Sequence, residues 1–413
     1  MIEVGQPELL LTTPDDTTAI FSTATYSRRR GIESVLTYFY ERMSDVADES
    51  FYRWSADNGH TWSGSCGLNA VHDLPSAKGI VLPSGPCHEG QRNPFTRERL
   101  VVGLSRSRPE GMDPDTPQTY WTQTAMTYAL SRDDGRTLGE PRPIIKAGRG
   151  FTEQHPFEGL VLGRNQVYGV YPALFLDRDT VLIPLEVSVL GEDGKLYNPH
   201  GWDFSQVIVL IGRRSGDGFA WDSAKPILVD AFKESTRGMN EPTMARLSDG
   251  RLIMVMRGSN SFIPALPSRK WISVSEDQGR TWSHPQPWTY DDGTAFYSPS
   301  SISQLVRHSG GRLYWFGNIC PQNADGNSPR YPLVIGEVDL HTGLLKRSTV
   351  TTIADRAPDQ DARIQFSNFS VYEDRRTREF VLDVTHFHPS GKPNRRGTGE
   401  GWTGNVYRYR IMP

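Results

Sequence analysis

Ser-Glu-Asp-Gln-Gly-Arg-Thr-Trp at residues 275–282 decides the fold of this chain, because the same pattern returns elsewhere with the same spacing. Residues 55–62 repeat it as Ser-Ala-Asp-Asn-Gly-His-Thr-Trp, and residues 131–138 repeat it with Leu138 in place of the Trp. A shortened copy is readable at residues 215–221. In each copy we expect a tight β-hairpin, where the Asp accepts turn N–H groups and the Gly adopts a positive φ. Repetition at blade-sized intervals indicates a β-propeller.

The stretches between these turns read as short alternating strands, which is the pattern of propeller blades. Residues 243–247, 251–256 and 270–274, for example, lead into the turn at 275–282. The turns that mark the blades lie near Asp57, Asp133, Asp217, Asp277 and Asp339, and the final segment adds one more. We therefore predict an all-β, six-bladed β-propeller. Residues 8–12 are predicted to complete the last blade and close the ring, which abolishes sheet edges.

Residues 1–413 are predicted to form a single domain, because propellers run long as single domains. Two stretches, at about 76–120 and 147–204, are rich in Pro and Gly. We predict that both are long loop inserts which wall a pocket, since loops on a rigid ring are where function tends to lie.

Composition excludes several classes of protein and partner. The 413 residues carry 45 basic and 48 acidic side chains, which gives no reason to expect nucleic acid as a partner. No apolar run reaches the roughly 18 residues of a membrane span, so no membrane partner is expected. The start, residues 1–4, lacks a basic stretch followed by an apolar core. We expect no signal peptide and a cytoplasmic location, although a trimmed N-terminus would leave secretion open.

The three cysteines, Cys66, Cys87 and Cys320, are far apart and odd in number, which favours free thiols in a reducing compartment. There is no Cys-x-x-Cys pair, and we predict neither a metal site nor a cofactor. The oligomeric state is left open.

The repeated motif is similar to the Asp-box, or BNR repeat, of the sialidase-like propeller glycosidases, and residues 240–257 carry the most specific resemblance. Enzymes of that superfamily have a Glu that opens this strand and an Arg that ends the next, both aimed at the central cavity. The resemblance implies that Glu241 activates a tyrosine or positions substrate, and that Arg257 and Arg330 bind its anionic group. The alternative for Glu241 and Arg257 is a structural pair, and for Arg330 a plain surface arginine.

The loop before the first repeat contains acidic residues at the place where sialidases offer a general acid/base. The resemblance implies that either Asp45 or Asp48 has this role, with a pKa raised by the cavity, and the choice between them stays open. Arg42 is a further candidate for anion binding. A solvated acidic loop is the alternative.

Two departures from the sialidase pattern favour another sugar or another mechanism. Ser22 stands where the first arginine of the triad is expected, and Asn368 stands at the place of the nucleophilic tyrosine. Tyr297, on the neighbouring blade, is the remaining candidate for a nucleophile or an acid. We keep Asn368 as a candidate for substrate binding.

Histidines supply a competing chemistry. His155, close to Glu158, and His200, close to Trp202, lie within the predicted inserts. A histidine base, a tyrosine acid and an arginine that neutralises a uronate could together run β-elimination. We count His155 and His200 as catalytic candidates, Glu158 as a candidate for substrate binding, and Trp202 as an aromatic surface for a sugar.

These features together predict an exo-type glycoside hydrolase that acts on an acidic or modified sugar and not on ordinary sialosides. Its expected partner is a carbohydrate. Two alternatives stay open: a polysaccharide lyase for uronate-containing glycans, and a carbohydrate-binding propeller without catalytic activity. The identity of the sugar, its linkage and the stereochemical course are not given by the sequence.

Overall fold

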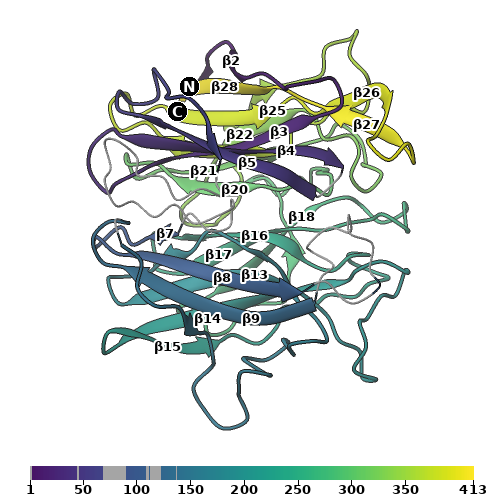
Figure 1. The fold of residues 1–413 in the computed structure, drawn as a ribbon. Helices are drawn as coiled ribbons and strands as arrows, with labels where there is room; N and C mark the ends of the chain where they lie inside the picture. Colours follow the sequence, from purple (N-terminus) through teal and green to yellow (C-terminus); the bar gives the residue numbers. More distant parts are fainter. Residues whose placement is uncertain (1, 44–45, 68–89, 108–110, 112–121, 136) are drawn as a thin grey trace.

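A computed structural model describes residues 2–43, 46–67, 90–107, 111, 122–135 and 137–413 of the chain. Six antiparallel sheets of four or five strands contain almost all of its regular structure. The ribbon in Figure 1 shows the sheets arranged around a common centre. This arrangement confirms the prediction of an all-β, six-bladed propeller.

Each blade is one sheet whose strands follow one another along the chain, except in the last blade. Blade 1 contains β3 (Ala19–Tyr26), β4 (Ser34–Met43), β5 (Val46–Ser55) and β6 (Cys66–Gly67). Blade 2 contains β7 (Gln91–Arg92), β8 (Arg99–Ser107), β9 (Thr122–Ser131) and β10 (Arg142–Pro143). Blade 3 contains β11 (Val167–Val170), β12 (Leu174–Phe175), β13 (Thr180–Ser188), β14 (Ser205–Ser215) and β15 (Gly218–Ser223).

Blade 4 contains β16 (Asn240–Arg246), β17 (Leu252–Arg257), β18 (Lys270–Ser275) and β19 (Gln286–Pro287). Blade 5 contains β20 (Gln304–Arg307), β21 (Leu313–Asn318), β22 (Leu333–Val338) and β23 (Thr351–Ala354), with the 3₁₀ turn η3 (Arg347–Thr349) before β23. Blade 6 contains β24 (Phe369–Glu373), β25 (Phe380–Thr385) and β28 (Val406–Met412). A separate hairpin, β26 (His388–Pro393) with β27 (Glu400–Thr403), projects from the connection between β25 and β28.

The N-terminus closes the ring. Strands β1 (Glu3–Val4) and β2 (Glu8–Leu11) both pair with β28, so the two ends of the chain lie side by side (Figure 1). Closure gives the outer edge of blade 6 its hydrogen-bond partners. The predicted closing strand at residues 8–12 is therefore confirmed, and β1 extends the closure toward the end of β28.

The three full copies of the repeated motif form the same hairpin turn. In the copy of blade 4, Asp277 Oδ1 accepts a hydrogen bond from Thr281 N at 2.9 Å, and Ser275 Oγ accepts one from Gly279 N at 2.8 Å. Gly279 has φ +87°, which a residue without a Cβ adopts at little cost. The turns at Asp57 and Asp133 repeat these bonds. In the shortened copy, by contrast, the Asp217 carboxylate pairs with Arg142.

These turns define two ends of the propeller. They join the third strand of a blade to the fourth, whereas residues 258–269, 319–332 and 386–405 join the second strand to the third. The two kinds of connection therefore lie at opposite ends of the blades. We call the end with the Asp-box turns the turn face and the other end the mouth face. The hairpin β26–β27, at the right of Figure 1, lies on the mouth face.

The prediction of long loop inserts is wrong in part. Strand β8 lies within 76–120, and strands β11, β12 and β13 lie within 147–204. The prolines in these stretches favoured the prediction of loops over strands. Pro184 lies in the middle of β13, yet all nine residues of β13 pair with β14. Residues 76–89, 108–110 and 112–120 of the first stretch lie outside the described residues.

Apolar side chains fill the space between neighbouring blades. Between blades 4 and 5, for example, the rings of Trp288 and Trp315 pack edge to face with centroids 5.3 Å apart. Both are among the fully buried side chains. Such packing fixes the blades relative to one another and so fixes the residues at the mouth face. In the described part of the chain, no helix has the length and apolar character needed to cross a membrane.

Candidate active site

A cavity of about 650 Å³ opens at the mouth face, and residues from blades 1, 3, 4, 5 and 6 line it. Volumes of this order are typical of small-molecule sites. Its acidic lining residues are Glu41, Glu186, Asp203, Glu241 and Glu400, and its basic ones are Arg42, Arg237, Arg257 and Arg330. We call it the mouth cavity. The charged side chains of five blades thus meet at one place.

Glu186, on strand β13, is the most heavily hydrogen-bonded carboxylate of the mouth cavity. Its Oε2 accepts a hydrogen bond from Tyr171 Oη at 2.7 Å and one from Glu241 N at 3.2 Å. Its Oε1 accepts from Asn240 Nδ2 at 2.6 Å and from Ser205 Oγ at 3.3 Å. Four donors therefore hold a carboxylate that is only 8% exposed. A buried carboxylate with this many donors is fixed in position.

Burial, with the Glu186 and Glu241 carboxylates next in importance, raises the pKa of Tyr171 well above its ordinary value. The phenol therefore keeps its proton at neutral pH and acts as a hydrogen-bond donor to Glu186. A phenolate nucleophile at this position is disfavoured.

Glu241 opens β16 in an irregular part of the strand. The register between β16 and β17 shifts between Asn240 and Thr243, and Glu241 has φ +45°, which is unusual for a residue with a side chain. A β-bulge of this kind redirects a side chain and is frequent beside active sites. Here it turns the Glu241 amide toward Glu186 while the Glu241 side chain lines the mouth cavity.

Glu241 and Arg257 form an ion pair, with 2.6 Å between Glu241 Oε1 and Arg257 Nη1. Arg257 Nη2 also lies 3.4 Å from Asn327 Oδ1. The other carboxylate oxygen of Glu241 is buried and has no hydrogen-bond partner among the described residues. The pairing that the sequence allowed as a structural alternative is thus present, yet both side chains still face the mouth cavity.

Arg330 enters the mouth cavity from the connection between β21 and β22. Its guanidinium donates to Ser300 O, at 2.7 Å from Nη2, and to Gln365 Oε1, at 3.0 Å from Nη1. These contacts orient the side chain between blades 5 and 6. Arg257 and Arg330, both singled out from the sequence, therefore line one cavity.

A lysine lies beneath this group of charges. Lys270, the first residue of β18, is fully buried, and its ammonium donates to the backbone carbonyl of Ser301. Burial is the largest influence and lowers the pKa of Lys270 to about 7, while Glu241 acts in the opposite direction. The lysine is therefore close to the border between its charged and neutral forms at physiological pH.

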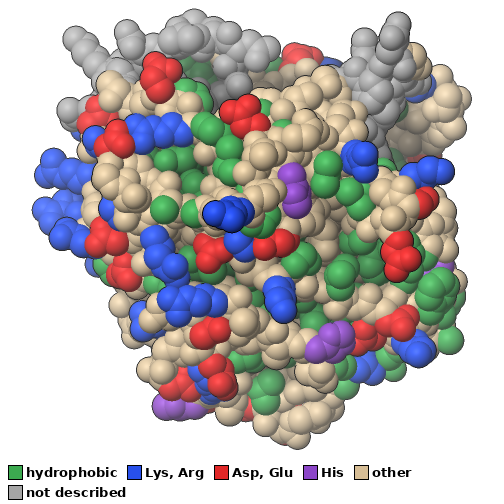
Figure 2. Space-filling model, turned by 90° about the horizontal axis from the view of Figure 1, so that it is seen from below, with side chains coloured by type: hydrophobic (Ala, Val, Ile, Leu, Met, Phe, Trp, Pro, Cys, Tyr) green, Lys and Arg blue, Asp and Glu red, His purple; other side chains and the backbone are tan. Residues whose placement is uncertain are grey.

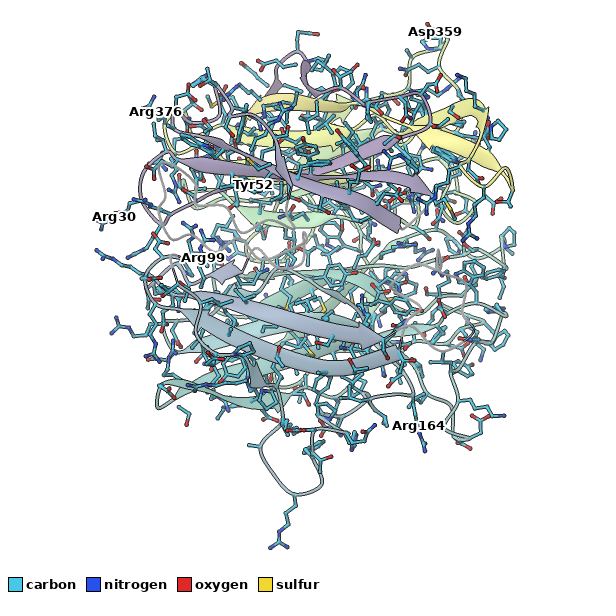
Figure 3. All side chains as sticks on the ribbon, in the orientation of Figure 1. Arg30, Tyr52, Arg99, Arg164, Asp359 and Arg376 are labelled. Atoms are coloured by element: carbon cyan, nitrogen blue, oxygen red, sulfur yellow. The ribbon has the colours of Figure 1, made fainter. Side chains whose placement is uncertain are left out.

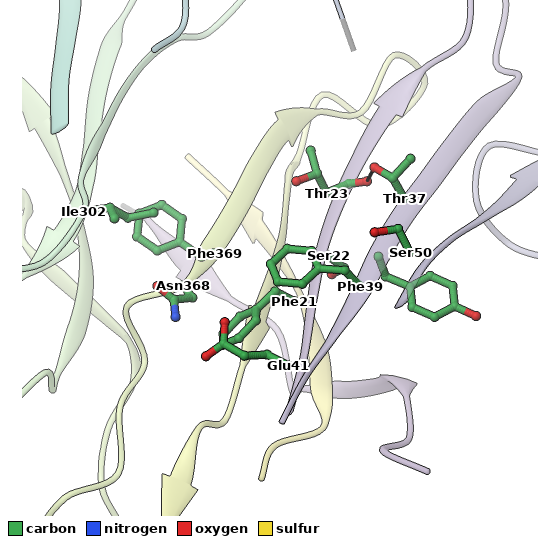
Figure 4. A pocket seen from close by; sticks show the side chains of 11 residues that line it. Phe21, Ser22, Thr23, Thr37, Phe39, Glu41, Ser50, Ile302, Asn368 and Phe369 are labelled. Carbon is green, nitrogen blue, oxygen red and sulfur yellow. Dashed lines mark hydrogen bonds between the residues drawn. The ribbon is translucent and has the colours of Figure 1, made fainter. Parts of the chain in front are cut away.

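A smaller cavity of about 280 Å³ extends along β3 and β4, and Glu41 lines both cavities. Figure 4 shows the phenyl rings of Phe21 and Phe369 beside Asn368, with Ser22 nearby on β3. Of the described residues that line this cavity, Glu41 alone carries a charge. Both positions at which the sequence departs from the sialidase pattern therefore face a space of mixed polar and apolar lining, with no cation among its described lining residues.

Two of the predicted catalytic residues are not among the described residues that line the mouth cavity. Asp48 forms an ion pair with Arg395 and accepts a hydrogen bond from Arg42 N at 2.9 Å, and it is not among the lining residues. Tyr297 is 39% exposed and is not among them either. Asp45 lies outside the described residues. Arg42 does line the cavity, while its guanidinium pairs with Glu49.

The predicted histidine chemistry is not assembled. His155 packs against Phe151, and Glu158 pairs with Lys146 at 2.6 Å. His200 lies against the backbone carbonyl of Ala231, at 3.0 Å from its Nε2. No histidine is among the described residues that line the mouth cavity.

Aromatic side chains flank the mouth cavity on the side of blades 3 and 4. Trp202 is 49% exposed, and its ring centroid lies 5.8 Å from the guanidinium carbon of Arg237, which lines the cavity. Phe232 and Phe262 are similarly exposed, and both contact the His200 ring. Trp202 thus lies beside a lining residue of the mouth cavity, and its role as a surface for a sugar stays a prediction.

The sequence analysis missed Glu186 and Tyr171. The available signal was the single Glu in the apolar run of residues 181–187. In a strand of buried residues, a lone carboxylate is retained only where donors compensate its burial.

The fold has known counterparts. One is a protein of unknown function from Dyadobacter fermentans, with a TM-score of 0.59, 11% identity and coverage of 100% of this chain and 99% of that one. The NanB sialidase from Streptococcus pneumoniae matches with a TM-score of 0.54 and 13% identity, over 99% of this chain and 70% of that one. An α-L-arabinofuranosidase from Fusarium graminearum matches with a TM-score of 0.50 and 13% identity, over 99% and 98%.

At these identities the likeness concerns the fold. No curated protein sequence is significantly similar to the chain. The sequence profile of the BNR repeat-like domain matches residues 115–343, which is more than half of the chain and includes two of the three full turn motifs. The protein therefore belongs to the BNR repeat-like domain family, with a propeller of the sialidase type.

Proposed function

We propose that the protein is an exo-type glycoside hydrolase whose reaction takes place in the mouth cavity. The observation that carries the proposal is that the carboxylates of Glu186 and Glu241 face one cavity, where the Glu186 carboxylate also accepts a hydrogen bond from the backbone amide of Glu241. Hydrolysis of a glycosidic bond commonly uses two carboxyl groups, one for proton transfer and one at the anomeric centre.

The surroundings of the two carboxylates suit different roles. Glu186 is held by four donors, which suits a group that stabilises or attacks the anomeric carbon. Glu241 has one oxygen on Arg257 and a second without a partner among the described residues, which suits proton transfer to and from substrate. Tyr171 then positions Glu186, and Arg257 positions Glu241.

The charges of the mouth cavity indicate the class of substrate. Its lining contains nearly equal numbers of carboxylates and guanidiniums. This balance suits a sugar that carries one acidic or modified group more than a densely anionic chain. Arg257 and Arg330 are our candidates for contact with that group, and Arg237 and Arg42 lie within the same lining.

Ordinary sialosides fit this site less well. The described lining of the cavity beside Ser22 and Asn368 contains no cation, and burial raises the pKa of Tyr171, which is hydrogen-bonded to a catalytic candidate. Because burial keeps the Tyr171 phenol protonated, we assign it to positioning Glu186 and assign the anomeric centre to Glu186 itself. The substrate end that reaches the smaller cavity is expected to be uncharged.

Two further observations support a glycosidase. The structural neighbours include a sialidase and an α-L-arabinofuranosidase by their own descriptions. The exposed ring of Trp202 at the entrance also offers an apolar face on which a sugar of the leaving group could stack. We favour the hydrolase over the lyase alternative, because neither His155 nor His200 is among the described residues that line the mouth cavity.

The test is turnover against a panel of aryl glycosides that includes uronates, pentosides, deoxysugars and a sialoside. We expect release of the leaving group from at least one of the first three kinds and none from the sialoside. Glu186→Gln and Glu241→Gln should each abolish turnover, whereas Glu276→Gln, an exposed acid on the turn face, should not change it. Robust release of sialic acid would contradict the substrate class. An unsaturated product would favour a lyase, and glycan binding without turnover would favour a non-catalytic propeller.

A further inference from the structure

A second group of arginines lies on the turn face, at the opposite end of the blades from the mouth cavity. The turn between β3 and β4, the turn between β7 and β8, and the Asp-box turn of blade 2 enclose a cavity of about 420 Å³. Arg28, Arg29, Arg30, Arg97 and Arg132 line it, together with two aspartates. Arg30 and Arg99, labelled in Figure 3, lie on the same side of the molecule, and Figure 2 shows Lys and Arg side chains along its left edge.

Both aspartates of this cavity are already used within the protein. Asp133 is the Asp-box carboxylate of blade 2 and accepts hydrogen bonds from Ser131 Oγ at 2.9 Å and from Thr137 N at 2.9 Å. Asp134 accepts a 2.6 Å hydrogen bond from Arg29 N and lies 3.8 Å from the guanidinium of Arg92. Neither carboxylate is therefore available to neutralise all the arginines around it.

Several of the guanidiniums have no acidic partner. Arg28 lies 3.4 Å from Glu33, and Arg132 donates to a backbone carbonyl of Asp217. In the described parts of the chain, the side chains of Arg29, Arg30 and Arg97 form no ion pair or hydrogen bond. Three cations thus face one hollow with their donors unused.

A second layer of positive charge lies beneath. Arg92 and Arg99 both donate to backbone carbonyls at the end of β3, Arg92 to Tyr26 O at 2.7 Å. Burial first, and the neighbouring charge of Arg99 second, lower the pKa of Arg92 to about 9. Burial and the neighbouring positive charge therefore both disfavour the charged form of Arg92. An anion held above these arginines would stabilise their charged forms.

We propose that this cavity binds a small multivalent oxyanion, such as the phosphate or sulfate groups of an esterified sugar. A planar guanidinium matches the geometry of phosphate and sulfate and can bind them through two N–H groups. The cavity is of small-molecule size, and the whole chain carries a formal net charge of −3, which disfavours a polynucleotide. This inference does not depend on the reaction proposed for the mouth cavity.

The experiment is isothermal titration calorimetry of the full-length protein at low ionic strength, with inorganic pyrophosphate in one arm and a trisulfated disaccharide in the other. We expect saturable binding in at least one arm. Tighter binding of pyrophosphate would indicate a phosphate ligand, and tighter binding of the disaccharide would indicate a sulfated sugar. The double variant Arg29→Ser/Arg30→Ser should weaken binding by roughly tenfold or more. Arg97→Ser, which changes a third arginine of the same lining, should weaken binding in the same direction.

The matched control is Arg280→Ser, an exposed arginine in the Asp-box turn of blade 4 on the same face. It should leave the affinity unchanged. Thermal unfolding of each variant checks that the turns stay folded, and a variant that unfolds is replaced by the single Arg30→Ser substitution. Absence of binding in both arms would overturn the proposal. Unchanged affinity in the cavity variants, or equal weakening by Arg280→Ser, would overturn it as well.

Discussion

The phenol of Tyr171 donates a 2.7 Å hydrogen bond to the carboxylate of Glu186, and both side chains line the mouth cavity. The two residues belong to blade 3, where Tyr171 follows the inner strand β11 and Glu186 lies on β13. A tyrosine and a glutamate thus meet within one blade, while the position of the last blade where the sialidase pattern has its tyrosine is occupied by Asn368. With its pKa raised by burial, the phenol of Tyr171 keeps its proton and can donate to Glu186, which is the positioning role that we propose for it.

Tyr171→Phe should therefore impair the reaction without abolishing it. Removing a hydrogen bond to a charged group costs about 1.5–3 kcal/mol, which corresponds to a loss of roughly 10- to 100-fold in kcat/KM. The loss should fall mainly on kcat, because the phenol holds Glu186 and not the substrate. Steady-state kinetics on the best glycoside of the panel measures it.

The control is Tyr197→Phe, which removes the hydroxyl of a partly exposed tyrosine in the connection between β13 and β14. It should leave kcat and KM unchanged. Unaltered kinetics of Tyr171→Phe would mean that the phenol does not support the reaction. Complete loss of turnover, with the fold intact, would instead make Tyr171 a catalytic residue.

Local sequence was sufficient for the fold because the turns are local structures. Every bond of the turn at Asp277 joins residues within four positions of one another, so the motif carries its own geometry. The closing strand at residues 8–12 was also readable, because ring closure needs a strand outside the last blade. Strand β13 of blade 3 was missed because Pro184 stands within its otherwise apolar run, and proline is uncommon inside a paired strand.

The candidate site was only partly predictable, because it is built from distant segments. Glu241, Arg257, Arg330 and Arg42 were found and do line the mouth cavity. Glu186 accepts a hydrogen bond from Asn240, which lies 54 positions away, and no local motif predicts this contact. The environment of Asp48 was unpredictable for a related reason, because its ion-pair partner Arg395 lies 347 positions along the chain. No sequence pattern distinguishes Lys270 from an exposed lysine of a strand, and only the fold shows that it is buried.

The ion pair of Glu241 and Arg257 makes a prediction about stability. Both side chains are largely buried, and Arg257→Met would leave Glu241 as a buried charge without its partner. Breaking such a pair typically costs about 3–5 kcal/mol. Urea denaturation should show a lower free energy of unfolding by that order for Arg257→Met. The double variant Glu241→Gln/Arg257→Met should recover a substantial part of the loss.

The double variant serves as the internal control, because it removes the same arginine without leaving a charge behind. If Arg257→Met and the double variant lose equal stability, the lost arginine packing and not the uncompensated carboxylate accounts for the effect. That result would contradict the pairing as an energetic unit.

The Asp-box turns should be needed for stability and not for activity. Burial acts to raise the pKa of Asp277, but the hydrogen bonds from Thr281 and Ser275 outweigh it and lower the pKa. Asp277→Asn weakens these charge-assisted bonds, and we expect Tm at pH 7 to fall by about 2–8 °C. Because the folded-state pKa lies below the unfolded value, the stabilisation is present above pH 4 and disappears as the pH falls further.

Thermal unfolding of wild type and Asp277→Asn at pH 7 and at pH 3 measures this difference. The gap in Tm should narrow at pH 3, because this pH lies below the ordinary aspartate pKa of 3.8 and the unfolded chain then binds the proton more readily than the folded protein. Turnover at a temperature well below both Tm values should be the same for the two proteins, because the turn lies on the opposite face from the mouth cavity. A selective loss of activity in Asp277→Asn would contradict this separation.

Lys270 makes the stability of the protein depend on pH in the neutral to alkaline range. An unfolded lysine titrates near 10.5, whereas burial lowers the pKa of Lys270 in the folded protein to about 7. Between these values the unfolded chain binds the additional proton, so this group lowers stability as the pH falls from 10.5 toward 7. Lys270→Met removes the effect, and its stability relative to wild type should be greatest at pH 7 and smaller at pH 9.5.

Urea denaturation at the two pH values measures this difference. The control is Lys233→Met, an exposed lysine whose substitution should change stability equally at both pH values. An equal difference for Lys270→Met at pH 7 and pH 9.5 would show that the buried ammonium does not titrate in this range, and that the Ser301 carbonyl and Glu241 keep it charged.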